Sequence, residues 1–230
     1  MNGLLSHESL SIAQHDEMFA LLAAHFEGVT REQFERDLAA KNWVVEIRRD
    51  GRLLGFSTLL VREAQHEGRA ITAIYSGDTI VAPEAWGSPA LARAWIAAVN
   101  ELLTPLPDRP CYWLLLTSGF RTYRFLPVFW REFYPRHDAP TPAPMRRLLR
   151  ELAGAQYGSN FDATDGVVRF PQPQRLRGSL GVVPPGRAAD EHVAFFLARN
   201  PGHARGDELV CLTEISDANL TRAGRRMIQP

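Results

Sequence analysis

The feature that most constrains the fold is a pair of apolar segments joined by a tight turn. Residues 43–48 and 53–61 are each of strand length, and the dipeptide Asp50-Gly51 lies between them. Such a dipeptide between two apolar runs is typical of a two-residue β-hairpin turn. The sequence therefore predicts two neighbouring antiparallel strands, around which the other elements can be placed.

Apolar spacing and end signals predict alternating helices and strands before and after this hairpin. In chain order we expect helices from Asp16 to Gly28 and from Thr30 to Lys41, the hairpin, a strand over 70–81, a helix over 91–102, a strand over 111–117 and a short helix over 121–133. The segment 111–117, CYWLLLT, is apolar throughout, which indicates a strand buried on both faces in the middle of the sheet.

Beyond Pro135 the composition changes, and a proline-rich connection follows. Helices over 145–155 and 189–202, the second with a glycine stop, a strand over 207–215 and a helix after Asp217 are predicted there. We therefore expect a core over residues 1–135 and a C-terminal extension over 136–230 that packs on the core and completes the sheet. A lid over the core and a contact in a homodimer are open alternatives for this extension.

Composition excludes several classes of protein. Lysine plus arginine and aspartate plus glutamate both number 26, and this balance gives no bulk field for nucleic acid or an anionic membrane. Cys111 and Cys211 lie in apolar runs, which favours free thiols in a reducing compartment. We expect no signal peptide, and the sequence shows no apolar run of about 18 residues and no metal-ligand spacing among the histidines. We expect a cytoplasmic bacterial protein without a membrane span or a metal.

The order of the elements and three motifs resemble the GNAT superfamily of N-acyltransferases. WVVEIRRDGRLLGFSTLLV (43–61) resembles the second and third strands of that family. IVAPEAWG (80–87) resembles the end of its fourth strand and the start of its acyl-carrier loop, and FWREFYP (129–135) resembles the end of the helix after its fifth strand. The resemblance covers about residues 14–135. It implies an α/β fold with a mixed, mostly antiparallel central sheet flanked by helices.

The resemblance also implies a function, the transfer of an acyl group from a pantetheine thioester to a small amine. In that family the fourth and fifth strands diverge to hold the pantetheine arm, and the next helix presents unpaired amides to the pyrophosphate. Ile80 and Val81 fall on the donor-binding strand end. The donor would be a co-substrate, so no tightly bound cofactor is expected.

The acyl-carrier loop departs from the family pattern. Trp86, Pro89 and Leu91 stand where that family has Gln or Arg and two small residues, and proline has no amide to donate. Gly87 and Ser88 alone keep small-residue amides for a donor phosphate. An acyl carrier protein, which presents one phosphodiester, is therefore a candidate donor alongside acyl-CoA. In the alternative interpretation Ser88 only caps the next helix, with Pro89 as its first residue.

The candidate catalytic residues lie near the ends of the two diverging strands. Asp78 is the first choice for a general base or an amine-binding carboxylate, because aspartate is rare in strands and costly to bury. Tyr75 and Tyr123 could move a proton, since the family's frequent tyrosine falls on Trp130 here. Gly77 could mark a bulge. Strand alternation places Thr72, Ile74, Ser76 and Asp78 on one face and Tyr75, Gly77 and Thr79 on the other.

A second polar segment, TSGFRTYR, follows the strand over 111–117. Substrates of open α/β sheets bind beyond the carboxyl ends of strands, which makes Thr117 and Ser118 candidate substrate contacts. Ser76 joins them from the neighbouring strand. Arg121, with Arg124, could bind a phosphate or a substrate carboxylate.

Two other functions fit the sequence. An inactive binding or interaction protein of the same fold would also lose the loop glycines and the family tyrosine. A thioester decarboxylase would keep the donor site without needing an amine. Donor binding, thiol release and the mass of the product distinguish the three.

Overall fold

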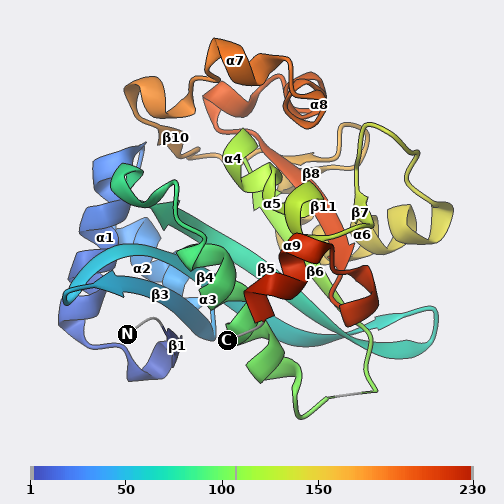
Figure 1. Ribbon diagram of the computed structural model, residues 1–230, viewed down its shortest axis with the longest axis horizontal. Helices are drawn as coiled ribbons and strands as arrows, with labels where there is room; N and C mark the ends of the chain where they lie inside the picture. The colour runs from blue at the N-terminus through green and yellow to red at the C-terminus, as the bar shows by residue number, and fades with distance from the viewer. Residues whose placement is uncertain (1–2, 107, 229–230) are drawn as a thin grey trace.

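The computed structural model describes residues 3–106 and 108–228, and a twisted mixed sheet forms its centre (Figure 1). The strands follow one another across the sheet in the order β1 (Gly3–Ser6), β3 (Trp43–Arg49), β4 (Arg52–His66), β5 (Arg69–Val81), β6 (Cys111–Thr117), β11 (Glu208–Glu214), β9 (Val167–Val168) and β8 (Phe161–Asp162), with β7 (Phe133–Tyr134) also beside β11. Among the described strands only β5 and β6 pair in parallel. The predicted mixed, mostly antiparallel α/β fold is confirmed.

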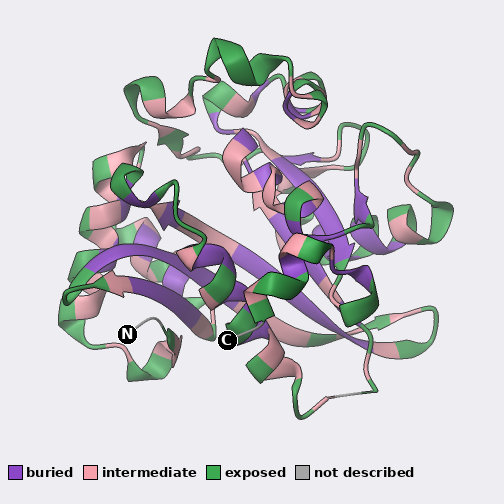
Figure 2. Ribbon diagram, viewed as in Figure 1, coloured by how far each residue is buried: buried purple, intermediate pink, exposed green. Residues whose placement is uncertain are grey.

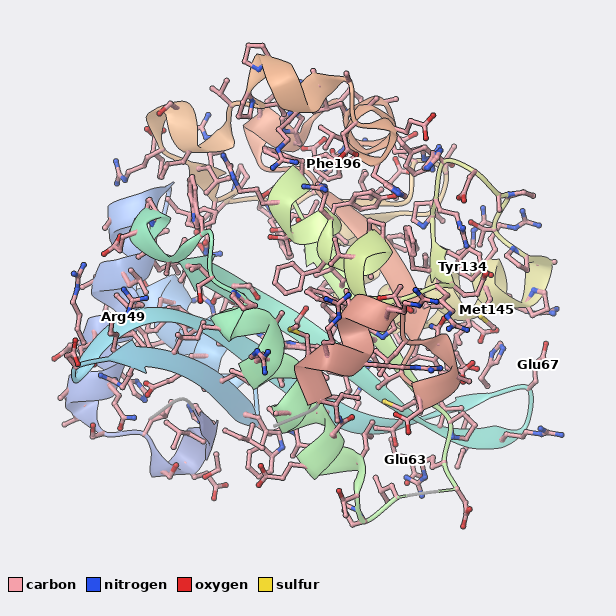
Figure 3. The ribbon with its side chains drawn as sticks, in the orientation of Figure 1. Arg49, Glu63, Glu67, Tyr134, Met145 and Phe196 are labelled. Atoms are coloured by element: carbon pink, nitrogen blue, oxygen red, sulfur yellow. The ribbon has the colours of Figure 1, made fainter. Side chains whose placement is uncertain are left out.

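Helices cover both faces of this sheet. One face packs against α3 (Ala90–Leu103), α4 (Phe120–Tyr123), α5 (Phe125–Phe129), α8 (Glu191–Arg199) and α9 (Arg222–Ile228). The other packs against α1 (Ile12–His25), α2 (Arg31–Ala39) and α6 (Ala143–Tyr157). We call these the α3 face and the α6 face. Phe196 of α8 and Met145 of α6 mark the two layers in Figure 3, and most of the sheet between them is buried (Figure 2).

Two tight turns build the antiparallel half of the sheet. Asp50 and Gly51 have φ of 51° and 80°, as a two-residue turn with two left-handed positions requires. This confirms the predicted hairpin. Glu67 and Gly68 repeat that geometry, with φ of 49° and 77°. Consequently β4 runs on to His66, beyond the predicted end of the strand at 61, and the β4–β5 hairpin projects from the body at Glu67 (Figure 3).

Local end signals account for the first two helices. α1 begins at Ile12, one turn before the predicted start after Asp16. Ser11 forms a capping box with Gln14, because the Ser11 hydroxyl accepts from the Gln14 amide and the Gln14 side chain accepts from the Ser11 amide. At α2, the predicted cap is present, since the Thr30 hydroxyl accepts from the Gln33 amide at 3.2 Å.

The parallel strands β5 and β6 separate halfway along. Their pairing runs from Thr72 opposite Cys111 to Ser76 opposite Leu115 and then stops, while β5 continues beside β4 to Val81. The divergence expected from the family resemblance is therefore present. It opens a gap between the carboxyl ends of the two strands.

A bulge in β5 lies where the separation begins. Leu59 pairs with Ser76 and Ser57 with Thr79, so that Gly77 and Asp78 both oppose a single β4 residue. The extra residue shifts the alternation of side chains. Thr79, rather than Asp78, shares the α3 face with Ser76, and Asp78 turns to the α6 face near α2. The expected grouping of Asp78 with Ser76 on one face is thus wrong for this reason.

The extension contributes to the sheet and to a second layer over it. β11 pairs antiparallel with β6, from Leu209 opposite Thr117 onward. A strap over residues 172–187 crosses to the first helices, where Leu176 of β10 (Arg175–Leu176) pairs with Phe26 of β2 (Phe26–Glu27). α7 (Pro185–Ala188) ends the strap (Figure 1).

Two of the remaining expectations concern helices. The helix predicted over 121–133 is instead the two short helices α4 and α5, and residues 133–134 form β7. No helix in the described part of the chain has the length and apolarity that a membrane crossing needs.

Candidate active site

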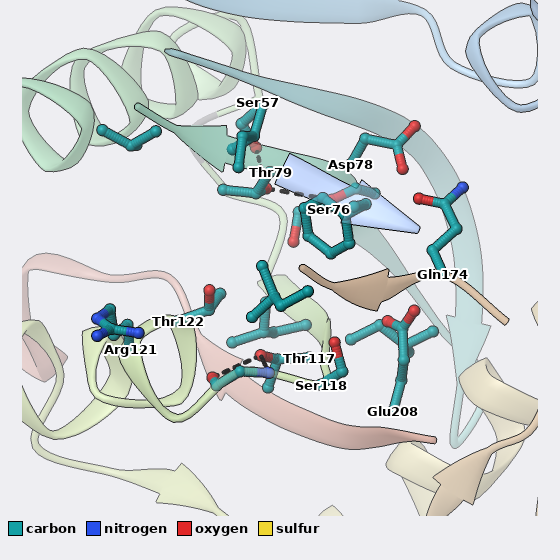
Figure 4. Close-up of a pocket in the computed structure, with 18 of the residues that line it drawn as sticks. Ser57, Ser76, Asp78, Thr79, Thr117, Ser118, Arg121, Thr122, Gln174 and Glu208 are labelled. Atoms are coloured by element: carbon teal, nitrogen blue, oxygen red, sulfur yellow. Dashed lines mark hydrogen bonds between the residues drawn. The ribbon is translucent and has the colours of Figure 1, made fainter. Parts of the chain in front are cut away.

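A cavity of about 820 Å³ lies where β5 and β6 diverge, with walls from both the core and the extension (Figure 4). It reaches the α3 face at Arg121 and the α6 face at Asp78 and Glu208. The predicted site residues that line it are Tyr75, Ser76, Asp78, Ile80, Val81, Gly87, Ser88, Thr117, Ser118 and Arg121. The polar segments at the two strand ends are thus brought together.

Tyr123 is placed elsewhere. Its side chain is fully buried beside Phe133 and Phe196 and does not line the cavity. Its hydroxyl donates to the Pro135 carbonyl at 3.0 Å, and burial raises the pKa of the phenol. The expectation that Tyr123 faces the cleft is corrected, because α4 turns this side chain into the core under α8.

Tyr75 and Ser76 line the cavity but have partners in the wall. The Tyr75 hydroxyl accepts from the Arg62 guanidinium at 3.0 Å, and burial raises the pKa of the phenol. The Ser76 hydroxyl accepts from the Trp113 indole at 2.9 Å. Both side chains therefore shape the floor of the cavity at the last paired residues of β5 and β6.

Asp78 is the second residue of the bulge and faces the cavity from β5. Burial raises the pKa of its carboxyl to about 6; the positive charge of Lys41 lowers this pKa and the negative charge of Asp37 raises it. Its side chain has no hydrogen bond or ion pair with any residue that the structure describes. An unpaired carboxylate at a cavity wall is a strong candidate for chemistry.

Glu208 is the residue that the sequence does not reveal. It opens β11, where Val210 and Leu212 pack under α6, so alternation places the Glu208 side chain on the same α6 face. Burial raises the pKa of this carboxyl to about 8, with added repulsion from Asp78 and Asp37. Figure 4 shows Glu208 and Asp78 extending from different strands into the pocket. The signal in the sequence is an acidic residue at the start of a buried strand. It indicates a site residue only when the pairing of β11 with β6 is known.

The α6-face end of the cavity holds further polar groups from α2 and from the residues that follow it. Lys41 donates to the Asp37 carbonyl at 2.9 Å and lies against Gly77, where an added Cβ would come within 2.7 Å of the lysine Cε. The side-chain oxygen of Gln33 is buried and without a hydrogen-bond partner. Together with Asp78 and Glu208, this end of the cavity therefore presents carboxylates, a lysine and an unsatisfied hydrogen-bond acceptor.

The end of β5 offers backbone groups to the cavity. The Ala82 amide donates to the Leu54 carbonyl of β4 at 2.8 Å. Since polar groups of an antiparallel strand alternate in direction, those of Val81 and Thr79 point away from β4, toward the gap. The polar groups of Ile80 point to β4 instead, so Thr79 takes the place expected for Ile80. The Val81 carbonyl already accepts from the Trp86 indole at 2.8 Å.

The loop before α3 uses most of its own amides. The amides of Trp86 and Ser88 donate to the Pro83 and Ala85 carbonyls at 3.2 and 3.0 Å, and the Ala90 amide donates to the Ser88 hydroxyl at 3.1 Å. The expectation of a free Ser88 amide is therefore corrected. The alternative interpretation is one residue out, because α3 begins at Ala90 with Pro89 as its N-cap residue, while the Ser88 hydroxyl accepts from the Ala90 amide.

Thr117 and Ser118, two predicted substrate contacts, differ in whether their hydroxyls already have hydrogen-bond partners. The buried Thr117 hydroxyl accepts from the Gly119 amide at 3.0 Å and donates to the Gly119 carbonyl at 2.9 Å, which fixes the turn after β6. The Ser118 hydroxyl has no hydrogen bond with the described residues. Ser118 is thus better placed than Thr117 to contact a ligand.

The described residues give little support for metal chemistry or for a cysteine nucleophile. In the described residues, no group of three or more His, Cys, Asp or Glu side chains could hold a metal ion. Cys111 and Cys211 are buried free thiols, as predicted, and burial raises the pKa of the Cys111 thiol to about 12. Such a thiol is a poor nucleophile at neutral pH.

No protein-family model matches the sequence, and no curated protein matches it. Solved structures similar to the chain include an acyl-CoA N-acyltransferase from Pseudomonas aeruginosa, 19% identical, with 50% of this chain and 77% of that chain covered and a TM-score of 0.37. A GNAT family N-acetyltransferase from Escherichia coli, in complex with CoA, is 13% identical, with 56% and 68% covered and a TM-score of 0.38.

A conserved protein of unknown function from Enterococcus faecalis, described as a probable N-acyltransferase, is 13% identical. There 94% of this chain and 66% of that chain are covered, with a TM-score of 0.45. Likenesses this distant concern the fold and say nothing of the substrate.

Proposed function

We propose that this protein transfers an acyl group from a pantetheine thioester to a small amine. The observation that carries the proposal is the gap between β5 and β6, which opens directly onto the two unpaired carboxylates of Asp78 and Glu208. A thioester held in the gap would present its carbonyl carbon to a nucleophile resting against those carboxylates.

The donor arm fits the gap by its own chemistry. Pantetheine is an extended chain with two amides, and an extended chain pairs naturally with a free strand edge. The edge at Thr79 and Val81 supplies such groups, and Gly87 lies beyond it. Acyl-CoA and an acyl carrier protein both provide this arm, and either is a donor under the proposal.

The acceptor end fits an amine. Asp37, Asp78 and Glu208 line this part of the cavity, with Lys41 as the neighbouring cation. Clustered carboxylates raise the local concentration of a cationic substrate. The unsatisfied oxygen of Gln33 would accept a hydrogen bond from the N–H group of such a substrate.

The proton transfers are assigned to the two carboxyls. The bound ammonium first releases one proton to solvent; its neutral nitrogen then attacks the thioester carbonyl carbon, and Asp78 accepts the second proton that this nitrogen releases. The C–S bond then breaks, its electron pair leaves on sulfur, and Glu208 in its acid form protonates the thiolate. A proton passing from Asp78 to Glu208 restores the starting state, so the products are an amide and a free thiol. With pKa values of about 6 and about 8, both groups start in the required form near neutral pH.

Glu208 and the strap come from the extension, so the proposal gives residues 136–230 a part in the site. We place the reaction in the bacterial cytoplasm, in keeping with the two free thiols.

The test follows thiol release and product mass with acyl-CoA and acyl-carrier donors and a mixture of amines. Asp78→Asn is expected to lower kcat by about 10²-fold at unchanged donor affinity. Asp50→Asn, in an exposed turn outside the cavity, is the matched control. Absence of donor binding and thiol release would leave only the binding protein. Thiol and carbon dioxide without an acylated amine would establish the decarboxylase.

A further inference from the structure

Arginine side chains gather at the α3-face end of the cavity. Arg121, Arg124 and Arg187 all line it; Arg121 lies in α4, Arg124 directly follows this helix, and Arg187 lies on α7 of the strap. Asp78 and Glu208 lie at the other end (Figure 4), and Asp37, which also lines the cavity, is near enough to raise the pKa of both carboxyls by charge repulsion. The cavity is therefore positive at one end and negative at the other.

Arg121 is held in place by apolar and polar contacts. Its guanidinium carbon lies 4.1 Å from the Trp86 ring centre and 4.7 Å from that of Phe120, and Nη1 donates to the Leu180 carbonyl at 2.8 Å. A guanidinium has five N–H donors, and one of them is used here. The side chain is thus fixed beside the loop that precedes α3, with donors remaining.

Arg124 and Arg187 are linked to each other through Asp190. Arg124 Nη2 lies 3.3 Å from Asp190 Oδ2, and the Asp190 amide donates to the Arg187 carbonyl at 3.1 Å. Arg124 Nε is buried without a hydrogen-bond partner, which is an unsatisfied donor at the cavity wall. The exposed Arg187 side chain has no hydrogen bond or ion pair with the described residues. Asp190 neutralises part of the charge, which leaves a net positive cluster.

The loop between β5 and α3 offers few donors for the same task, since among residues 86–90 the amide of Gly87 is the one without a hydrogen bond. Pro89 has no amide, and the amides of Trp86, Ser88 and Ala90 are already bonded within the loop. A phosphate at this end of the cavity would therefore meet guanidinium groups rather than a row of backbone amides. Guanidinium forks bind phosphate oxygens in pairs.

We propose that Arg121, Arg124 and Arg187 form a binding site for the phosphate at the end of a pantetheine arm. The proposal rests on the function inferred above, since it names the group that anchors the donor. The same phosphate is found in free phosphopantetheine, in CoA as part of a pyrophosphate, and on a carrier protein as a phosphodiester. The strap supplies Arg187 and the Leu180 contact, so the site exists only with the extension folded against α4.

The test compares the affinities of pantetheine, phosphopantetheine and CoA, measured by calorimetry, for the full chain and its variants. Phosphopantetheine is expected to bind about tenfold or more tightly than pantetheine. Arg121→Gln and Arg187→Gln are expected to reduce this ratio toward one at unchanged pantetheine affinity. Arg146→Gln, an exposed arginine of α6 outside the cavity, is the matched control and keeps the ratio. Arg121→Lys retains the positive charge and is the second variant at this position, so that a loss of affinity in Arg121→Gln can be told from a loss of folding.

Three outcomes separate this proposal from the proposed function. Equal binding of pantetheine and phosphopantetheine overturns the phosphate site and leaves acyl transfer standing. Failure of every pantetheine compound to bind, while pyrophosphate alone binds and loses affinity in the two glutamine variants, supports the anion site and sinks the acyl-transfer function. A preference that survives in Arg121→Gln and Arg187→Gln overturns the assignment of the residues. A higher affinity for CoA than for phosphopantetheine identifies CoA as the donor. Equal affinities show that one phosphate is enough, as in the phosphodiester of a carrier protein.

Discussion

Trp113 donates its indole N–H to the Ser76 hydroxyl at 2.9 Å, next to the point where β5 and β6 separate. Trp113 packs in turn on Trp95 and Trp130, with ring centres 4.2 and 5.0 Å away. The bond therefore connects the last paired residue of β5 to the aromatic core of the α3 face. It fixes where the gap begins.

Replacing Ser76 by alanine should weaken the fold more than the chemistry. The substitution leaves a buried indole donor without an acceptor, which costs about 1–3 kcal/mol in the free energy of unfolding. Urea denaturation measures this loss, with Ser118→Ala as the control, expected within about 0.5 kcal/mol of the parent. Unchanged stability with a large fall in kcat would instead show that Ser76 relays a proton.

Stability should fall as the pH rises through the range where the two buried carboxyls ionise. Both have raised pKa values in the folded state, about 6 for Asp78 and about 8 for Glu208, so the folded chain binds more protons than the unfolded chain. The loss is expected to begin above pH about 4, where the unfolded carboxyls ionise, and to be complete above pH about 8. Melting temperature against pH measures it. The Asp78→Asn, Glu208→Gln double variant should show a flatter profile, and a parallel one would contradict the pKa shifts.

The pH dependence of kcat should be bell-shaped if the two carboxyls act as base and acid. Activity rises as Asp78 ionises near pH 6 and falls as Glu208 loses its proton near pH 8. Glu208→Gln is expected to lower kcat by about 10²-fold and to remove the alkaline limb that belongs to this residue, while the acid limb stays. Glu151→Gln, an exposed residue of α6 that contacts His66 and does not line the cavity, provides the comparison. An alkaline limb that is identical in Glu208→Gln would exclude Glu208 as the acid.

The glycine of the β5 bulge should resist enlargement because Lys41 and Thr58 occupy the space beside it. A Cβ at position 77 would lie 2.7 Å from Lys41 Cε and 2.8 Å from Thr58 Oγ1. Gly77→Ala is expected to destabilise the fold by about 1–3 kcal/mol. Shortening the lysine removes one of the two clashes, so Lys41→Ala, Gly77→Ala should lose less than the sum of the single changes. Chemical denaturation of the four proteins measures this coupling, and strict additivity would argue against the contact.

The order and type of the core elements could be predicted because they depend on local signals. The Asp50-Gly51 turn, the Thr30 cap and the apolar run over 111–117 each specify their own structure. The polar residues at the ends of β5 and β6 could be found for the same reason, since a divergent pair of strands brings neighbouring strand ends together. One candidate of this kind, Tyr123, fails because the direction of its side chain depends on where α4 ends.

Other parts of the site depend on pairings that a single sequence does not display. Glu208 matters only because β11 pairs with β6, more than ninety residues earlier in the chain. The direction of Asp78 depends on a one-residue bulge, which alternation along a strand cannot anticipate. Arg187 joins the cavity through the packing of the strap against α4. These are long-range contacts, and the local sequence is compatible with several of them.

Lys41 is the one lysine of the chain, and it lies at the carboxylate end of the cavity. An amine-directed labelling reagent therefore has a single lysine side chain to modify, and that side chain touches the wall of the site. Any molecule that fills this end of the cavity will shield the lysine from the label. One mass shift in a digest thus reports directly whether the site is occupied, without a radioactive substrate or a second probe.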